Sequence, residues 1–159
     1  NYSSYTLYSI LSLISMGVYL ALKSAKLPLL VSEKEDFEVE EEPTFSDDWE
    51  ASTYLIPRDP SKSFQPALAF VVGAVGNTVI IDPSLEEEQI IEHGIGITWS
   101  NDRITTPIQS LTLSSSNTKG LKPALIFKAI EVVRNVAKDV VNALNAISEQ
   151  QVDVLDTAF

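Results

Sequence analysis

Two pairs of strand-like runs, each joined by a short turn, restrict the fold of this chain more than any other feature. The four runs are residues 67–75, 78–81, 95–99 and 103–113. Gly76-Asn77 joins the first pair, and both residue types tolerate the positive φ of a tight hairpin turn. The second pair is joined across "SND". Its apolar residues alternate, with Ile95, Ile97 and Trp99 on one face of the first strand and Ile104 and Ile108 on one face of the second.

Two helical patterns flank the predicted hairpins. The first helix is expected from Thr6 to Lys26, because Pro28 cannot continue it. Its predicted core-facing stripe is Leu7, Ile10, Leu11, Ile14, Val18, Ala21, Leu22 and Ala25. The last helix is expected from Pro123, a residue type suited to a first helical turn, to Leu144. Its predicted stripe is Leu125, Ala129, Val133, Val136, Ala137, Val140 and Leu144.

The remaining segments are short. Alternation of Phe37 and Val39 with acidic residues predicts a brief strand, and the prolines of residues 46–66 predict a loop. The order of helix, short strand, two hairpins and helix indicates an α+β domain with a mostly antiparallel four-stranded sheet backed by helices.

Composition narrows the classes of function. The chain has 159 residues, 45% of them apolar, which suits a globular domain with a real core. Its net charge of −11 would repel phosphate backbones, so we expect the chain alone to bind nucleic acid poorly. The absence of cysteine excludes disulfides and cysteine-ligated zinc. The first helix is interrupted by Ser9, Ser12, Ser15 and Tyr19, so we interpret it as packed on a core rather than membrane-spanning.

The stretch "VIIDPSLEEEQIIEHG" holds the strongest candidates for chemistry. Asp82 and Glu88 could supply oxygen ligands to Mg²⁺. The alternative is local structure, because Ser84 is a good N-cap and Glu87 three residues later completes a capping box. The spacing favours the local role. His93, the single histidine, has no partner in the pattern and is more typical of surface or core filling than of catalysis.

Several segments, taken in order, resemble a known family. "PALAFVVGAVGNTVIIDPSLEEEQI" and "GIGITWSNDRITTPIQS" are similar to the C-terminal half of the RNase PH fold, and more narrowly to RNase PH-like subunits of the eukaryotic RNA exosome. The helix and strand of "LSLISMGVYLALKSAKLPLL" and "FEVEEEPTF" fit the same half. The resemblance implies a C-terminal lobe over residues 1–149, with the loop 46–66 inside it, and a tail over 150–159. It also implies that the N-terminal half of the subunit is missing from this chain.

The resemblance also bears on the acidic stretch. Catalytic relatives carry a metal-binding Asp at the position of Asp82 and a second Asp six residues later, where this chain has Glu88. The longer side chain disturbs a tight octahedral site. We therefore expect no catalytic residue, no metal-binding residue and no cofactor. The competing hypothesis is an active Mg²⁺-dependent phosphorolytic 3'-5' exoribonuclease that uses Asp82 and Glu88.

The resemblance implies a non-catalytic structural subunit of the exosome core ring that supports RNA processing, including maturation of ribosomal RNA, and RNA degradation. Implied partners are other RNase PH-like ring subunits, cap subunits and, through the assembled central channel, RNA, with no membrane. The implied locations are nucleus, nucleolus and cytoplasm. No RNA-binding residue can be named. As exposed interaction residues we predict Leu29, Leu30, Val31 and Trp99.

Overall fold

The computed structural model describes residues 7–31, 43–59, 64–111 and 120–156. The chain divides into two compact units. The larger contains residues 1–20 and 65–159, and the smaller is Ala21–Phe64.

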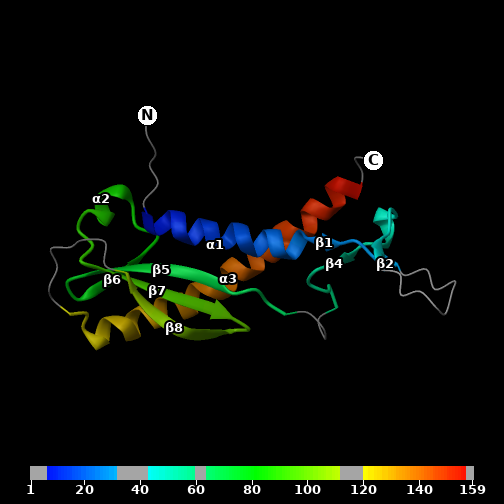
Figure 1. The fold of residues 1–159 in the computed structure, drawn as a ribbon. Helices are drawn as coiled ribbons and strands as arrows, with labels where there is room; N and C mark the ends of the chain where they lie inside the picture. Colours follow the sequence, from blue (N-terminus) through cyan, green and yellow to red (C-terminus); the bar gives the residue numbers. More distant parts are fainter. Residues whose placement is uncertain (1–6, 32–42, 60–63, 112–119, 157–159) are drawn as a thin grey trace. The chain divides into compact units, whose positions relative to one another are not determined.

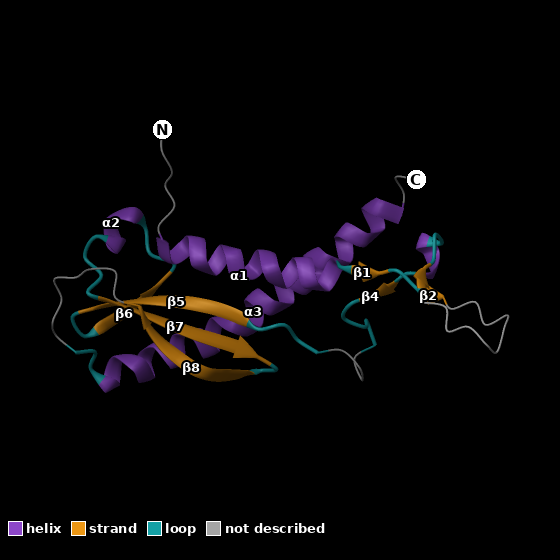
Figure 2. Cartoon of the chain, in the orientation of Figure 1, coloured by secondary structure: helices purple, strands orange, loops and turns teal. Residues whose placement is uncertain are grey.

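One four-stranded antiparallel sheet organises the larger unit (Figure 2). Its strands lie in the order β6-β5-β7-β8. Their bounds are β5 Leu68–Val75, β6 Thr78–Ile81, β7 His93–Ser100 and β8 Arg103–Leu111. This confirms both predicted hairpins and the α+β class.

The two hairpin turns use different backbone geometry. In the first, Gly76 takes a φ of 57°, and the side chains of Lys122 and Lys128 donate hydrogen bonds to Asn77 at 2.8 and 2.7 Å. In the second, Asn101 and Asp102 both take a positive φ, as a type I′ turn requires. Asn and Asp are the residue types that best accept this conformation after glycine, so the local sequence fixes the turn.

The core of the larger unit lies between the sheet and the long helix α3, Pro123–Asp156, which runs across one face of the sheet (Figure 1). α3 contacts all four strands. Alternate residues of β5 and β7 face it and are buried, as period two requires. The strand residues of this core are Leu68, Phe70, Val72, Ala74, Ile95, Ile97 and Trp99, and the helix residues are Leu125, Ala129, Val133, Ala137, Val141 and Leu144. The stripe predicted for α3 is confirmed except at Val136, which is half-buried and lies outside this cluster, and Val141 joins it.

The first helix, α1, spans Leu7–Ser24 and turns a different face to the core than the sequence predicted. Tyr19 is fully buried, and Met16 and Leu20 are partly buried against the core. The predicted stripe was wrong over much of its length, because Ile14 is 58% exposed and Val18 is 53% exposed. A helix that is apolar on nearly every side offers more than one stripe, and periodicity does not select among them.

A hydrogen bond to Ser15 explains which face of α1 is turned toward the sheet. β6 pairs with β5 only from Val72 to Val75 in the described residues, so the first half of β5 has no strand on that side. The Ala69 amide there donates to Ser15 Oγ at 2.8 Å. The serine that interrupts the apolar pattern is therefore the residue that ties α1 to the open edge of the sheet, where a bare edge would invite pairing with another chain.

The smaller unit contains two short antiparallel ladders. β1 (Lys26–Leu27) pairs with β4 (Thr53–Tyr54), and β2 (Leu30–Val31) pairs with β3 (Thr44–Phe45). A 3₁₀ turn covers Trp49–Ala51, with Asp48 as its N-cap. Residues 46–66 are therefore not a plain loop. β4 exists through pairing with a distant strand, which local proline content does not reveal. The strand predicted at Phe37–Val39 lies outside the described residues.

The last helix is longer than predicted. We expected it to end at Leu144 and a tail to occupy 150–159, whereas α3 continues to Asp156. "SEQQVDVLD" contains neither proline nor glycine, so nothing in it stops a helix. The division into a lobe over 1–149 and a separate tail stays a prediction.

Candidate functional site

The acidic stretch after β6 forms a short helix rather than an irregular loop. Asp82 follows the strand with a φ of 51°, which reverses the chain before α2 (Leu85–Glu88). Ser84 Oγ accepts from the Glu87 amide at 3.3 Å, and Glu87 Oε2 accepts from the Ser84 amide at 2.8 Å. The predicted capping box is confirmed. Three glutamates in this turn also complement the partial positive charge of the exposed amides.

The stretch is anchored to the sheet just beyond α2. The Glu92 amide donates to the Ala74 carbonyl at 2.9 Å. Ile91 packs against Gly73 of β5 so closely that a Cβ at Gly73 would collide with the Ile91 side chain. Because position 73 is glycine, the Ile91 side chain can pack directly against the backbone of β5 at the end of the acidic turn. This packing gives the stretch a structural role that needs no ligand.

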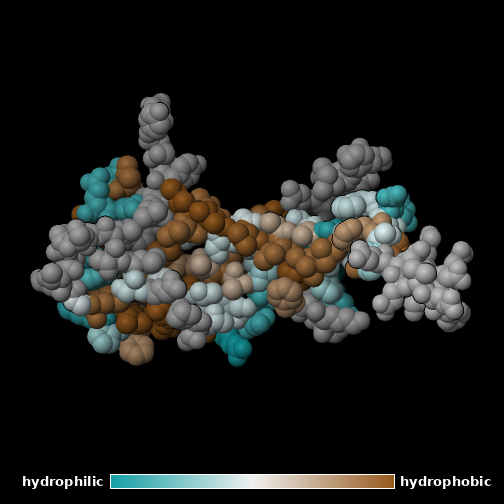
Figure 3. All heavy atoms as spheres, viewed as in Figure 1, coloured by the Kyte–Doolittle hydropathy of each residue, from teal (hydrophilic) through white to brown (hydrophobic). Residues whose placement is uncertain are grey.

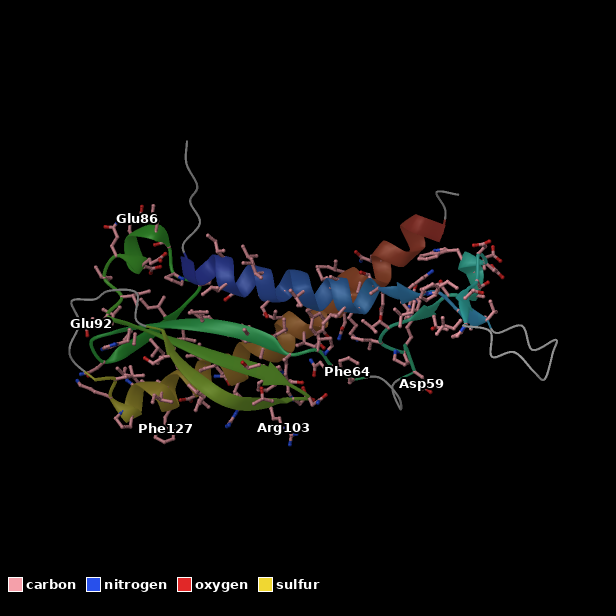
Figure 4. All side chains as sticks on the ribbon, viewed as in Figure 1. Asp59, Phe64, Glu86, Glu92, Arg103 and Phe127 are labelled. Atoms are coloured by element: carbon pink, nitrogen blue, oxygen red, sulfur yellow. The ribbon has the colours of Figure 1, made fainter. Side chains whose placement is uncertain are left out.

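The carboxylates of the stretch do not form a recognisable metal centre. Asp82 and Glu92 are exposed and Glu88 is half-buried. Glu86 projects from α2 away from the sheet, as Figure 4 shows. In the part of the chain that the structure describes, no three His, Asp or Glu side chains gather as a metal site would require. The assignment of no catalytic and no metal-binding residue stays a prediction.

His93 belongs to the core side of the fold. It begins β7 opposite Ala74 and is only 7% exposed. Its position in the alternation His93, Ile95, Ile97 predicts this burial, because residues two apart share a face. A histidine enclosed in this way is core filling, one of the two alternatives that the sequence left open.

A set of hydrogen bonds around the buried Tyr19 hydroxyl, not evident from the sequence, joins three parts of the larger unit. Tyr19 donates its hydroxyl hydrogen to Asn145 Oδ1 of α3 at 2.9 Å, and it also bonds Gln65. Gln65 in turn accepts from Ser100 Oγ at 3.0 Å and from the Asn101 amide at 2.8 Å. Burial raises the pKa of the Tyr19 phenol. These bonds hold α1, α3 and the second hairpin together, so their role is structural.

The surface with the greatest capacity for function is the outward side of α1. We define the α1 apolar face as Ile10, Leu13, Ile14, Gly17 and Val18, all of which are exposed. No charged residue precedes Lys23, so nothing in the helix breaks this face. Figure 3 shows hydrophobic residues gathered along α1. A Cβ at Gly17 would meet no atom within 4 Å, which leaves room for close approach of another chain.

The exposed residues named from the sequence are confirmed in part. Leu29, Leu30 and Val31 are exposed in the smaller unit. Trp99 is not: it is 1% exposed and belongs to the core. Its place at a strand end suggested exposure, but its alternation with Ile95 and Ile97 determined its face. No helix among the described residues is both long enough and apolar enough to cross a membrane.

Comparison with known proteins identifies the relatives of this chain. No family model matches it. Over 133 residues, 84% of this chain, it is 41% identical to the exosome complex component RRP42 of Saccharomyces cerevisiae. The chain is RRP42-like. The matched part is 47% of the yeast protein, so the chain spans about half the length of the curated relative it matches.

The RRP42-like sequence agrees with the fold described above. An α+β unit with an antiparallel sheet and long helices fits the C-terminal half of an RNase PH-like fold. The resemblance found from the order of motifs is thereby confirmed by a match across most of the chain. The yeast relative contains about as much polypeptide again as the matched part.

Proposed function

We propose that this RRP42-like segment is part of a structural, non-catalytic subunit of the RNA exosome core ring. In that assembly it supports 3'-5' RNA processing and degradation, including maturation of ribosomal RNA, by holding other subunits in place. Its partners are RNase PH-like ring subunits and cap subunits, with RNA passing through the shared central channel. The assembly works in the nucleus, the nucleolus and the cytoplasm.

The observation that carries this proposal is the α1 apolar face. Four aliphatic side chains and a glycine lie exposed along one helix. Full burial of one such aliphatic side chain contributes about 1.5–3 kcal/mol, so covering the face strongly favours association. Apolar patches of this kind mark contacts with other polypeptide. We assign the face to the remainder of the RRP42-like protein.

The acidic stretch supports the non-catalytic part of the proposal. Ser84 and Glu87 each accept a hydrogen bond from the other's backbone amide in the capping box, and the Ile91 side chain packs against Gly73. The residues around Asp82 and Glu88 are therefore explained by local folding. A structural subunit needs this turn to be stable, and it needs no reaction there.

A reconstituted complex tests the proposal. An RRP42-like protein that contains this segment, carrying Asp82→Ala, is assembled with its ring subunits and its RNA-degrading rate is measured with and without inorganic phosphate. We expect the rate to equal that of the unaltered complex. A tenfold loss, about 1.4 kcal/mol in the barrier, with assembly intact would favour the phosphorolytic enzyme instead. Failure of the unaltered protein to join the complex would overturn the structural role.

A further inference from the structure

The smaller unit holds two cations against one tyrosine. Lys26 in β1 pairs with Tyr54 in β4, and the Lys26 Nζ lies 5.2 Å from the centroid of the Tyr54 ring. The Arg58 guanidinium carbon lies 4.2 Å from the same centroid. Arg58 Nη2 also donates to the Tyr54 hydroxyl at 3.0 Å. We name Lys26, Tyr54 and Arg58 the Tyr54 clamp.

The clamp concentrates positive charge in an acidic chain. Each cation gains about 0.5–1 kcal/mol from the ring at an exposed site, which orients it but does not neutralise it. Arg58 is exposed and Lys26 is half-buried, so both charges remain accessible from solvent. Two like charges held against one ring repel each other, and a bound anion offsets that repulsion. Because the side chains are already oriented, an anion binds with less loss of side-chain entropy.

The surroundings distinguish a protein partner from RNA. The large apolar residues exposed on the same unit are Leu27, Leu29, Leu30, Val31, Phe45, Trp49, Leu55 and Phe64. RNA-binding grooves combine exposed aromatic rings with a positively charged track along the phosphate backbone, and the net charge of −11 opposes such a track. In the clamp the tyrosine ring already binds cations. Tyr and Arg beside aliphatic residues are the composition of protein interfaces, where a few such residues carry most of the binding energy.

We propose that the Tyr54 clamp binds an Asp or Glu carboxylate of a partner protein, whose neighbouring apolar side chains cover the exposed leucines of this unit. Arg58 offers the paired donors that match a carboxylate, and Lys26 supplies a second charge. The inference rests on the proposed role in a protein ring, and it adds the chemistry by which one contact of that ring is recognised.

A zero-length cross-link tests the contact directly. A water-soluble carbodiimide joins an amine only to a carboxylate that touches it. In the reconstituted complex described above, we expect a peptide containing Lys26 to be joined to an Asp or Glu of another subunit. Cross-links from Lys26 only within its own chain, or none at all, in an assembled complex would overturn the proposal.

Substitution gives an independent measurement. We expect Lys26→Gln with Arg58→Gln to weaken association with the other subunits at least tenfold, and Arg58→Lys with Lys26 intact to weaken it less. The matched control is Arg134→Gln with Lys138→Gln, which removes the same charge from the exposed side of α3 and should leave association unchanged. Equal association of both double variants would contradict the proposal, as would a loss confined to RNA binding. Failure of the unaltered protein to assemble would refute the proposed function rather than the clamp.

Discussion

α1 and α3 have similar apolar patterns, yet the structure uses them in opposite ways. In α3 the predicted stripe is buried against the sheet, with Val133 fully enclosed. In α1 much of the predicted stripe faces outward, with Ile14 58% exposed, while Tyr19 on another side enters the core. An apolar stripe shows that a helix has a partner. It does not show whether that partner belongs to the same segment of chain.

The largest loss of stability is expected from a substitution in α3. Val133→Asp places a carboxylate in the buried stripe of α3, where no partner is available. We expect the free energy of unfolding to fall by several kcal/mol, enough to abolish the cooperative transition. Urea denaturation followed by circular dichroism measures this. A variant that retained most of its stability would show that α3 is not the helix that holds the core.

Tyr19→Phe tests the side of α1 that does face the core. It removes the hydrogen bond to Asn145 and should cost about 0.5–1.5 kcal/mol. It should also change the alkaline limit of stability. Because burial raises the pKa of Tyr19 in the folded state, its stabilising contribution is complete below the unfolded value of 10.0 and is lost as pH rises through the folded value.

Denaturation midpoints measured on both sides of pH 10.0 check this effect, with Tyr54→Phe as the control in the smaller unit. The unaltered chain should lose stability with rising pH more steeply than Tyr19→Phe. Identical slopes would mean that the Tyr19 hydroxyl is not enclosed.

Ser84→Ala tests a position outside both α1 and α3. Loss of the capping box should cost about 1 kcal/mol, since α2 loses the side chain that accepts from the Glu87 amide. Thermal unfolding measures it, and Ser110→Ala, which alters an exposed serine of β8, is a suitable control. A cost near zero would remove the structural explanation of the acidic stretch.

Ile14→Asp should have the smallest effect on the segment itself. The side chain is exposed, so the expected cost is at most about 0.7 kcal/mol, the full span of helix propensity among ordinary residues. Had Ile14 faced the core, as the predicted stripe implied, the same change would cost several kcal/mol. The same change should prevent the α1 apolar face from packing against the remainder of the RRP42-like protein. Severe loss of stability in the segment alone would show that Ile14 is buried after all.

Short-range features were the most predictable. The hairpins depend on Gly76, Asn101 and Asp102, whose conformational preferences are visible in the sequence, and the capping box depends on residues three apart. The burial of Ile95 and Ile97 follows from alternation alone. Each of these features is determined within a few residues, so no knowledge of distant contacts is needed.

Features that depend on distant partners were missed. Tyr19 is selected for the core because Asn145 accepts its hydrogen bond across 126 positions of sequence. Ser15 is turned toward the sheet because the Ala69 amide, on the edge of β5 that β6 does not cover, needs an acceptor. β4 forms because Lys26 and Leu27 lie opposite it. In each case the choice is made by a residue far along the chain, which a local pattern does not contain.

The role of the acidic stretch could likewise not be fully predicted from the sequence. Its residue types permit either a metal site or a helix cap, and the sequence favoured the cap on spacing. The packing of Ile91 against Gly73 accounts for the position of the turn, and it could be seen only in the three-dimensional structure. The composition of a site indicates which chemistry is available, and packing indicates whether the chain needs it.

The accessibility of α1 tests the central claim most directly. This chain contains no cysteine, so Ile14→Cys introduces a single thiol into it, with Val133→Cys as a buried control and Glu131→Cys as an exposed control. Maleimide labelling at the introduced site is followed by mass spectrometry, in this segment and in an assembled RRP42-like protein. We predict rapid labelling of Ile14→Cys in the segment and at least tenfold slower labelling in the assembly, while Glu131→Cys reacts rapidly in both. Equal labelling of Ile14→Cys in the two states would contradict the assignment of the α1 apolar face to a polypeptide partner.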